Sequence, residues 1–580
     1  MADFDAIVIG SGAGGSMAAL AFAKKGLKVL VLEKGENYYP DLETGGSSFR
    51  NESVFGNDEL KFNDRLMIKT DPSIEPRSFR ASTSTTRDFV GDVNSLPSTV
   101  GGGLNHADWK ARRLRPADFR LHDVIGAQSG ASVVNWPIGY SDLEPFYDAV
   151  ETIVGVQGPA ELPAPFAPPR SNPYPMPPGV PSYVGIVLSD AASHLGLHPF
   201  AAPTGITSRP YRGRPACNDC GFDGNFGCPI GAKGSPAVTS LRDAVATGNV
   251  RLESSAMAFR LNKGAVGGKN AITSVDYLDG TGSAQGASAD LFVLAASPIE
   301  SARLALLSGL DEPGWGNSSG LLGKNLMFHF QTTAIGIFAN RLHAYRGRAV
   351  THMLDDFCGP ADVSAATVAA LLAPRGGTLE LGGSQDVIGE GKAYPRQLPH
   401  KTLMRISPTR DRLAAMTMQG EDLPQESNFV DLDPDIKDVY GLPVARITYK
   451  NHPYELLAAV HYLPTMLAIL AAAGAVFAAP LGSDLPHGIL PPELEQGIGS
   501  SGIVNAVPGS RHIMGVFRMG ADPATSVTDP FGKFHDLANL WSGDGAVWPT
   551  SAGMNPSLTI MALSLRMACN IVGLGVADVI

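Results

Sequence analysis

The side chains best suited to acid–base chemistry are a histidine and an asparagine late in the chain. His512 lies in RHIMGVFRMG (511–520), and Asn555 lies in GMNPSLT (553–559). A neutral imidazole can take a proton near neutral pH, and an amide N–H can bind a developing oxyanion without competing for that proton. Either residue alone is better explained as a structural one, His512 as a hydrogen-bonded core histidine and Asn555 as a turn residue before Pro556. The pair therefore needs a scaffold that would place both side chains over a substrate.

A glycine-rich stretch near residue 10 predicts such a scaffold. Gly10, Gly12 and Gly15 form GxGxxG between an apolar run at 6–9 and an alanine-rich segment at 14–25. The first glycine permits a tight turn, the second lets a pyrophosphate approach the backbone, and the third lets helix and strand pack closely. The pattern predicts a buried strand, a turn and a helix whose N-terminus binds phosphate.

An acidic residue in register strengthens this interpretation. Glu33 ends a second apolar run, KVLVLE (28–33), 23 positions after Gly10. Its carboxylate can accept from both ribose hydroxyls of a dinucleotide, which favours a free 2′-hydroxyl. A glycine turn with a purely structural role is the alternative, but strand, helix and acid in register favour a dinucleotide site.

The composition predicts an ordered chain of more than one domain. At 580 residues it is too long for one core, and its 44% hydrophobic and 17% charged residues are typical of a soluble enzyme. The net charge of −11 argues against a nucleic-acid partner, since the basic cluster KARRLR (110–115) is too short to bind phosphates. The opening MADFDAIVIG has no basic segment before an apolar one, so we expect no export signal and a cytoplasmic location.

Three further stretches bear on the organisation of the chain. The apolar run at 456–482 contains His461 and Pro464, so we expect a buried helix and no membrane span. The stretch 157–182 holds ten prolines and predicts an extended surface segment, either a linker or a loop over a cleft. A second strand-then-helix pattern occurs at 289–309.

Taken together, these stretches resemble the glucose-methanol-choline (GMC) family of FAD-dependent oxidoreductases. The resemblance extends over most of the chain, through the glycine fingerprint, STVGGGLNHADWKARRLRPADF (98–119), NWPIGYSDLEPFYDAVETIVGVQG (135–158), VLAASPIESARLALLSG (293–309), GLLGKNLMFH (320–329) and the segment 511–572. Within the family the chain is most similar to the bacterial FAD-dependent glucose, gluconate and glycoside dehydrogenase large subunits, which share the WPI-Y-DLEPFY and CPIGA stretches.

The resemblance implies an α/β chain, α+β overall. A Rossmann-like FAD-binding domain would carry a discontinuous substrate-binding domain built on an antiparallel sheet with helices. We expect the FAD-binding domain at 1–120, 205–330 and 500–580, and the substrate-binding domain at 121–204 and 331–499.

In the family that the chain resembles, His512 and Asn555 would face the reactive edge of the flavin ring. The implied reaction is alcohol oxidation, in which the base takes the hydroxyl proton and the carbinol hydrogen passes to flavin N5 as hydride. The implied FAD-binding residues are Gly10, Gly12, Gly14, Gly15, Glu33, Gly101, Gly102, Asn105, His106, Met257, Asp544, Gly545 and Pro556. His106 aligns with a histidine bonded covalently to the flavin in pyranose-oxidising relatives, but the tryptophan that usually follows it is Ala107 here, and covalency stays open.

Three of the five cysteines lie close together in CNDCGFDGNFGCPIGAKGS (217–235). Cys217, Cys220 and Cys228 on a loop with glycine and proline fit an iron-sulfur cluster, and the resembling branch holds a three-iron cluster there. The C-x2-C-x7-C spacing differs from that branch, and zinc would need a fourth ligand from His or Asp. Three buried free thiols are the alternative.

We therefore expect FAD-dependent oxidation of a sugar, glycoside or polyol alcohol, with electrons passed to an acceptor other than NAD. The alternatives are an oxidase that uses oxygen, an aromatic or benzylic substrate, an NAD-dependent dehydrogenase, and an electron-relay large subunit of a redox complex. The expected partners are a small-molecule alcohol, an external electron acceptor and a small subunit. A signal-bearing small subunit would allow a periplasmic location instead.

Overall fold

The computed structural model describes residues 2–42, 69–163, 166–362, 374–383, 411–480 and 508–580. The glycine-rich stretch folds as predicted, into β1 (Phe4–Ile9), α1 (Ala13–Lys24) and β2 (Val29–Leu32). β1 and β2 pair in parallel, and alternate side chains of β1 pack into separate cores on the two faces of the sheet. This is the pattern of a strand covered on both sides.

β1 belongs to a seven-stranded sheet with the order β6-β2-β1-β9-β8-β7, in which β17 also pairs with β9. The other strands are β6 (Val250–Glu253), β7 (Met257–Val266), β8 (Lys269–Leu278), β9 (Ala284–Leu294) and β17 (Leu540–Ser542). The second half of β9 is parallel to β1 and β17, and its first half is antiparallel to β8. The predicted Rossmann-like α/β class is confirmed.

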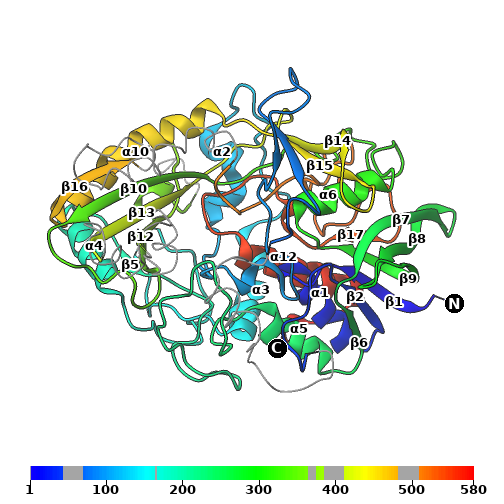
Figure 1. Cartoon of the computed structure of the whole chain (residues 1–580), viewed down its shortest axis with the longest axis horizontal. Helices are drawn as coiled ribbons and strands as arrows, with labels where there is room; N and C mark the ends of the chain where they lie inside the picture. Colours follow the sequence, from blue (N-terminus) through cyan, green and yellow to red (C-terminus); the bar gives the residue numbers. More distant parts are fainter. Residues whose placement is uncertain (1, 43–68, 164–165, 363–373, 384–410, 481–507) are drawn as a thin grey trace, which may run out of the picture.

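Helices cover both faces of this sheet. On one face lie α1, α5 (Ser240–Val245) and α12 (Ser557–Val572), with α3 (Tyr140–Val154) packed on α12, and on the other lies α6 (Pro298–Leu307), while the short α2 (Leu121–Ile125) lies apart. α12 packs between α1 and α3, so the last long helix contacts the first, as Figure 1 shows near its centre. β9 followed by α6 confirms the second strand-then-helix pattern.

A six-stranded antiparallel sheet has the order β16-β10-β13-β12-β11-β5. Its strands are β5 (Phe200–Ala201), β10 (Phe330–Phe338), β11 (Val350–Leu354), β12 (Leu379–Gly382), β13 (Leu413–Gly420) and β16 (Ala475–Pro480). Two helices cover its apolar face, α4 (Tyr183–His194) and α10 (Pro453–Ala472), on the left of Figure 1. Residues that alternate with that core face the other way, and those that line the cavity described below include the polar residues Gln331 on β10, Glu380 on β12, and Thr417 and Gln419 on β13.

A four-stranded sheet joins two distant parts of the chain. It has the order β14-β15-β3-β4 and consists of β3 (Arg77–Arg80), β4 (Phe89–Gly91), β14 (Phe429–Lys437) and β15 (Pro443–Thr448). β3 and β4 come from the first segment of the expected FAD-binding domain, and β14 and β15 from the expected substrate-binding domain. The expected boundary at 499/500 lies outside the described residues.

The apolar run at 456–482 differs from its prediction. The helix ends at Ala472, and an edge strand, β16, follows it. One face of α10 packs on the antiparallel sheet, but Leu457 and Val460 on its other face are 60% and 71% exposed. α10 is long and apolar enough to cross a membrane, which for a single helix is weak evidence. The prediction of a buried helix was thus wrong, because α10 covers the outside of a sheet and its other face is exposed to solvent.

The proline-rich segment 157–182 links α3 to α4. Its described residues form no helix or strand, and Gln157 makes isolated bridges to Met176 and Thr204. Missing N–H groups explain this irregular backbone.

Candidate active site

A cavity of about 610 Å³ extends from the N-terminus of α1 to the polar face of the antiparallel sheet. The predicted site residues that line it are Gly10, Gly12, Gly14, Glu33, Gly102, His106, Met257, His512, Asp544, Gly545, Asn555 and Pro556. Gly15, Gly101 and Asn105 lie behind the cavity wall. Residues from the two ends of the sequence therefore meet in one site.

The glycine turn shows three different steric requirements. Gly10 has φ +105°, and a Cβ there would lie 2.2 Å from the carbonyl oxygen of Ala295. A Cβ on Gly14 would lie 1.5 Å from the carbonyl oxygen of Gly543, so α1 and the turn after β17 touch backbone to backbone. A Cβ on Gly12 would meet only Gly102 Cα, at 3.9 Å, and would otherwise enter the cavity. Gly12 thus leaves space for a ligand, while Gly10 and Gly14 allow the close approach of neighbouring backbone segments.

Glu33 lies at the end of β2, where the cavity begins. Its Oε2 accepts from Ser11 N at 3.0 Å and Ser11 Oγ at 2.7 Å, and its Oε1 accepts from Gly35 N at 2.9 Å. A carboxylate has about four acceptor positions. Three protein donors occupy part of this capacity, and what remains is available to a ribose hydroxyl.

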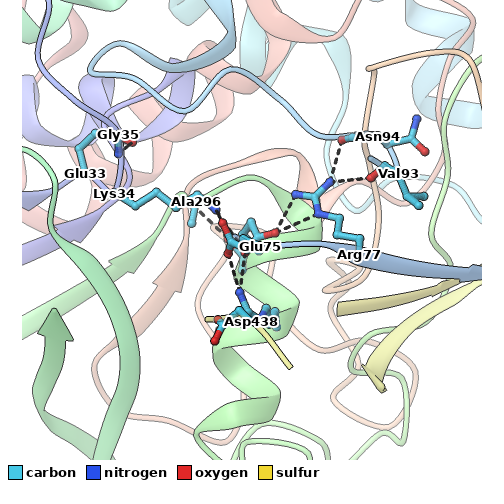
Figure 2. A network of polar contacts seen from close by, with 12 residues as sticks. Glu33, Lys34, Gly35, Glu75, Arg77, Val93, Asn94, Ala296 and Asp438 are labelled. Carbon is cyan, nitrogen blue, oxygen red and sulfur yellow. Dashed lines mark hydrogen bonds and ion pairs between the residues drawn. The ribbon is translucent and has the colours of Figure 1, made fainter. Parts of the chain in front are cut away.

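An ion-pair network borders the cavity beside Glu33 (Figure 2). Glu75 accepts from Lys34 at 2.9 Å and from Arg303 at 2.6 Å, and Arg303 also pairs with Asp438 at 2.6 Å. Each charge has an opposite partner, so these buried groups are compensated. The network fastens α6 to the end of β2.

Arg77 connects this network to the segment that carries His512. It pairs with Glu300 at 2.7 Å and donates to the carbonyl oxygen of Asn94 at 2.7 Å (Figure 2). Asn94 Nδ2 donates to the carbonyl oxygen of Ser510 at 2.9 Å, and the backbone N–H of His512 donates to Ser510 Oγ at 3.1 Å. Polar contacts therefore hold this segment from outside the cavity.

Asp544 lies where the cavity passes the first turn of the short 3-10 helix Gly545–Val547. Its carboxylate accepts from Ser301 Oγ at 2.6 Å and from Ala546 N at 2.9 Å. Burial raises the pKa of Asp544 to about 6, and these hydrogen bonds oppose the rise. By accepting these hydrogen bonds, the carboxylate connects α6, through Ser301, to the 3-10 helix that borders the cavity.

The second glycine turn packs against the first. Gly101 has φ +91°, and its N–H donates to Ser11 Oγ at 2.9 Å. Asn105 Nδ2 donates to the carbonyl oxygen of Val100 at 2.7 Å, which holds the turn. His106 follows it, is fully buried and lines the cavity.

His512 and Asn555 lie together at the far end of the cavity. Asn555 Nδ2 is 3.4 Å from His512 Nε2 and donates to Glu380 Oε1 at 3.0 Å. Among the described residues, Asn555 Oδ1 is buried without a hydrogen-bond partner. On its other side, His512 Nδ1 is 2.8 Å from Nδ1 of His329. The predicted pair is thus the middle of a longer row of polar side chains.

Both histidines are neutral in this environment. Burial, with a smaller contribution from the positive charge of Lys110, lowers the pKa of His512 to about 3. Burial also lowers the pKa of His329 to about 3, with a smaller contribution from His512. An unprotonated imidazole is the form that can accept a proton.

Sequence reasoning missed two residues of this row, Glu380 and His329. Glu380 lies on β12, and its Oε2 is 3.3 Å from Lys110 Nζ. No motif surrounds it in the sequence, so no local signal could have identified it. His329 is the last residue of GLLGKNLMFH (320–329), a stretch that carries part of the family resemblance, so a signal was present there.

The cysteine loop reaches the cavity through its residues Gly224 and Asn225. Cys217 and Cys228 are half-buried and Cys220 is exposed, so the alternative of three buried thiols is wrong for Cys220. Burial raises the pKa of Cys217 to about 12. In the part of the chain that the structure describes, no three His, Cys, Asp or Glu side chains are placed to hold a metal. The iron-sulfur cluster stays a prediction that the structure does not support.

The cavity fits a flavin dinucleotide by size and by wall chemistry. Its volume of about 610 Å³ is that of a cofactor pocket. Gly12, the N-cap of α1, has no side chain over the first helical turn, so the backbone N–H groups there can bind a pyrophosphate. A Rossmann-like sheet with this cradle and a neutral histidine at its far end defines a dinucleotide-dependent oxidoreductase.

Comparisons with known proteins identify the family. Residues 187–331 and 424–564 match GMC oxidoreductase, and residues 5–40 match an FAD-binding domain. The chain belongs to the GMC oxidoreductase family, and it is an FAD-dependent enzyme that acts on CH–OH groups. This confirms the resemblance found in the sequence.

Three relatives align along nearly the whole chain. Paromamine 6′-oxidase of Streptomyces fradiae is 30% identical and is matched over 98% of this chain and 91% of its own length. The 2-methyl-1,2-propanediol dehydrogenase of Mycolicibacterium austroafricanum is 28% identical, with 97% and 94% covered. The gluconate 2-dehydrogenase flavoprotein of Pantoea cypripedii is 26% identical, with 97% and 92% covered.

A solved structure supports the fold alone. Pyridoxine 4-oxidase superposes with a TM-score of 0.60 at 16% identity and covers 98% of both chains.

Proposed function

We infer that this enzyme oxidises a carbinol of a polyol, sugar or glycoside, with His512 as the base and Asn555 as its hydrogen-bonding partner. One observation carries the proposal: His512 and Asn555, 43 positions apart, meet at 3.4 Å in the cavity that begins at the glycine cradle. A neutral imidazole and an amide donor are the groups that loss of a hydroxyl proton requires.

These two side chains divide the work on the hydroxyl group. The lone pair of His512 Nε2 takes the hydroxyl proton, and an Asn555 N–H donates to the oxygen as its negative charge develops. FAD bound in the cradle would supply N5 as the acceptor of the carbinol hydride.

The polar face of the antiparallel sheet supports a substrate with several hydroxyl groups. Gln331 Nε2 donates to Gln419 Oε1 at 3.1 Å, and Thr417 lines the cavity beside them with Glu380. Among the described residues, no Phe, Tyr or Trp side chain lines the cavity, which disfavours a benzylic alcohol. The relatives' names agree, since a diol, gluconate and paromamine all carry several hydroxyl groups.

The electron acceptor divides the remaining alternatives. We propose an acceptor other than NAD, because the cradle takes a flavin dinucleotide and the relatives include dehydrogenases and an oxidase. If the enzyme is a dehydrogenase, we propose that it works with a small subunit and can be exported together with it. Turnover by the isolated chain with an artificial acceptor would argue against a pure electron-relay role, and rapid reoxidation by oxygen would identify an oxidase.

The test is anaerobic stopped-flow bleaching of the FAD-loaded protein with a panel of polyols, sugars, glycosides and benzyl alcohol. We expect bleaching by a member of the first three groups. His512→Ala should slow it by about 10²- to 10⁴-fold, the usual contribution of a positioned base, and should retain the flavin absorption bands. Bleaching of His512→Ala at the parent rate would show that the base lies elsewhere, with His106 as the next residue to replace.

A further inference from the structure

We propose that His329 is a positioning residue that fixes the tautomer of His512, so that His512 Nε2 faces the cavity without a proton. The inference rests on the function proposed above and adds to it a residue that does not touch the substrate. His329 directly precedes β10 and is 2% exposed.

The first step concerns the far side of the His329 ring. Its Nε2 is 3.2 Å from the carbonyl oxygen of Ser551. A carbonyl oxygen only accepts hydrogen bonds, so Nε2 of His329 must carry the hydrogen. Ser551 is itself held, because its Oγ accepts from Asp422 N at 2.7 Å and donates to the carbonyl oxygen of Asp422 at 2.9 Å.

The second step uses the hydrogen position on His329 to infer which nitrogen of His512 carries a hydrogen. A neutral His329 with hydrogen on Nε2 has a lone pair on Nδ1, and that atom is 2.8 Å from His512 Nδ1. Two lone pairs cannot form a hydrogen bond, so His512 carries its hydrogen on Nδ1. A neutral His512 then has its lone pair on Nε2, the atom 3.4 Å from the Asn555 amide. Burial lowers the pKa of both rings to about 3, which agrees with this neutral pair.

The third step concerns the moment of proton transfer. When His512 Nε2 gains the substrate proton, the His512 ring becomes positive and its Nδ1–H bond to His329 becomes charge-assisted. Such bonds are roughly twice as strong as neutral ones. His329 therefore acts on the rate of flavin reduction and hardly at all on substrate binding, as expected for an interaction that strengthens in the transition state.

Two replacements separate this role from packing. In His329→Asn, the amide Oδ1 occupies about the place of the ring Nδ1 and can accept from His512. In His329→Leu, an apolar side chain of similar size has no acceptor. We expect His329→Leu to lower the limiting rate of anaerobic flavin bleaching by about 10- to 100-fold, with the substrate Kd within about twofold of the parent. We expect His329→Asn to recover the rate to within about fivefold of the parent.

Each other outcome contradicts the proposal. A His329→Leu protein that bleaches at the parent rate, a loss equal in both variants, or a loss confined to Kd would assign His329 a packing role. Should His329→Leu fail to retain FAD, His329→Gln replaces it with the same expected loss, because its amide can donate to Ser551 without an acceptor at the Nδ1 position. If no alcohol bleaches the parent, or His512→Ala bleaches normally, the proposed function fails as well. A slow His512→Ala beside a normal His329→Leu would overturn only the tautomer assignment.

Discussion

The amide of Asn555 should contribute less to flavin reduction than the imidazole of His512. A hydrogen-bond donor to a developing oxyanion is worth about 10²- to 10³-fold, and a positioned base up to about 10⁴-fold. Because both groups act on one transition state, the double variant should lose less than the product of the single losses. Anaerobic stopped-flow bleaching of His512→Ala, Asn555→Ala and the double variant measures all three rates. Strict multiplication of the losses would mean that the two residues act on separate steps.

At the same scale, the sequence predicted the pair that the cavity brings together but not the residues around it. His512 and Asn555 were recognised because each lies in a motif that the family shares. Glu380 accepts a hydrogen bond from the Asn555 amide. It lies on β12, which pairs with β11 and β13 in the antiparallel sheet. Its place depends on sheet register, and a strand of four residues carries too little pattern to predict register.

At the scale of elements, two glycines of one turn should fail in different ways. Gly14→Ala places a methyl group 1.5 Å from the carbonyl oxygen of Gly543, so α1 and the turn after β17 must separate. Gly12→Ala places its methyl group in the cavity, 3.9 Å from the nearest backbone atom. We expect Gly14→Ala to lower thermal stability even without FAD, and Gly12→Ala to fold normally but retain little FAD.

Thermal unfolding of the two apo proteins and flavin content after reconstitution are the measurements. Equal stability of both apo variants would show that the contact between α1 and Gly543 yields easily.

The β1-α1-β2 unit could be predicted because its signal is local. Two apolar runs and three glycines within about thirty residues determine the strands, the turn and the helix. α10 was predicted less well, since an apolar helix over the outside of a sheet and a wholly buried helix have similar composition. The four-stranded sheet was not foreseen, because β3 and β15 pair across more than half of the chain.

At the scale of the whole molecule, several charged side chains are buried. The basic cluster at 110–115 contains Lys110, Arg112, Arg113 and Arg115, all at most 5% exposed. Arg113 pairs with Glu151 on α3 at 2.8 Å. The cluster is therefore buried, and its ion pair with Glu151 connects it to α3.

FAD should stabilise the whole molecule, because the cavity is lined by the seven-stranded sheet and by the antiparallel sheet. A ligand that binds only the folded state adds about 2.7 kcal/mol at 100 times its Kd. We expect added FAD to raise the Tm of the apo protein, and to raise that of Glu33→Ala less at the same concentration. Differential scanning fluorimetry with and without FAD measures both shifts. Equal shifts would mean that Glu33 serves Ser11 and Gly35 rather than the ribose.

The contact between α1 and α12 also determines how late in synthesis the glycine turn can be completed. Ser564 Oγ donates to the carbonyl oxygen of Gly14 at 2.7 Å, although the two residues are 550 positions apart. At the usual rate of about 5 to 20 residues per second, a ribosome needs about 30 to 110 seconds to pass from one to the other. The glycine turn before α1 therefore lacks its contact with α12 for most of translation. The apolar face of α1 that α12 covers stays without this partner during that time, so we expect FAD to bind late and a chain truncated before α12 not to retain it.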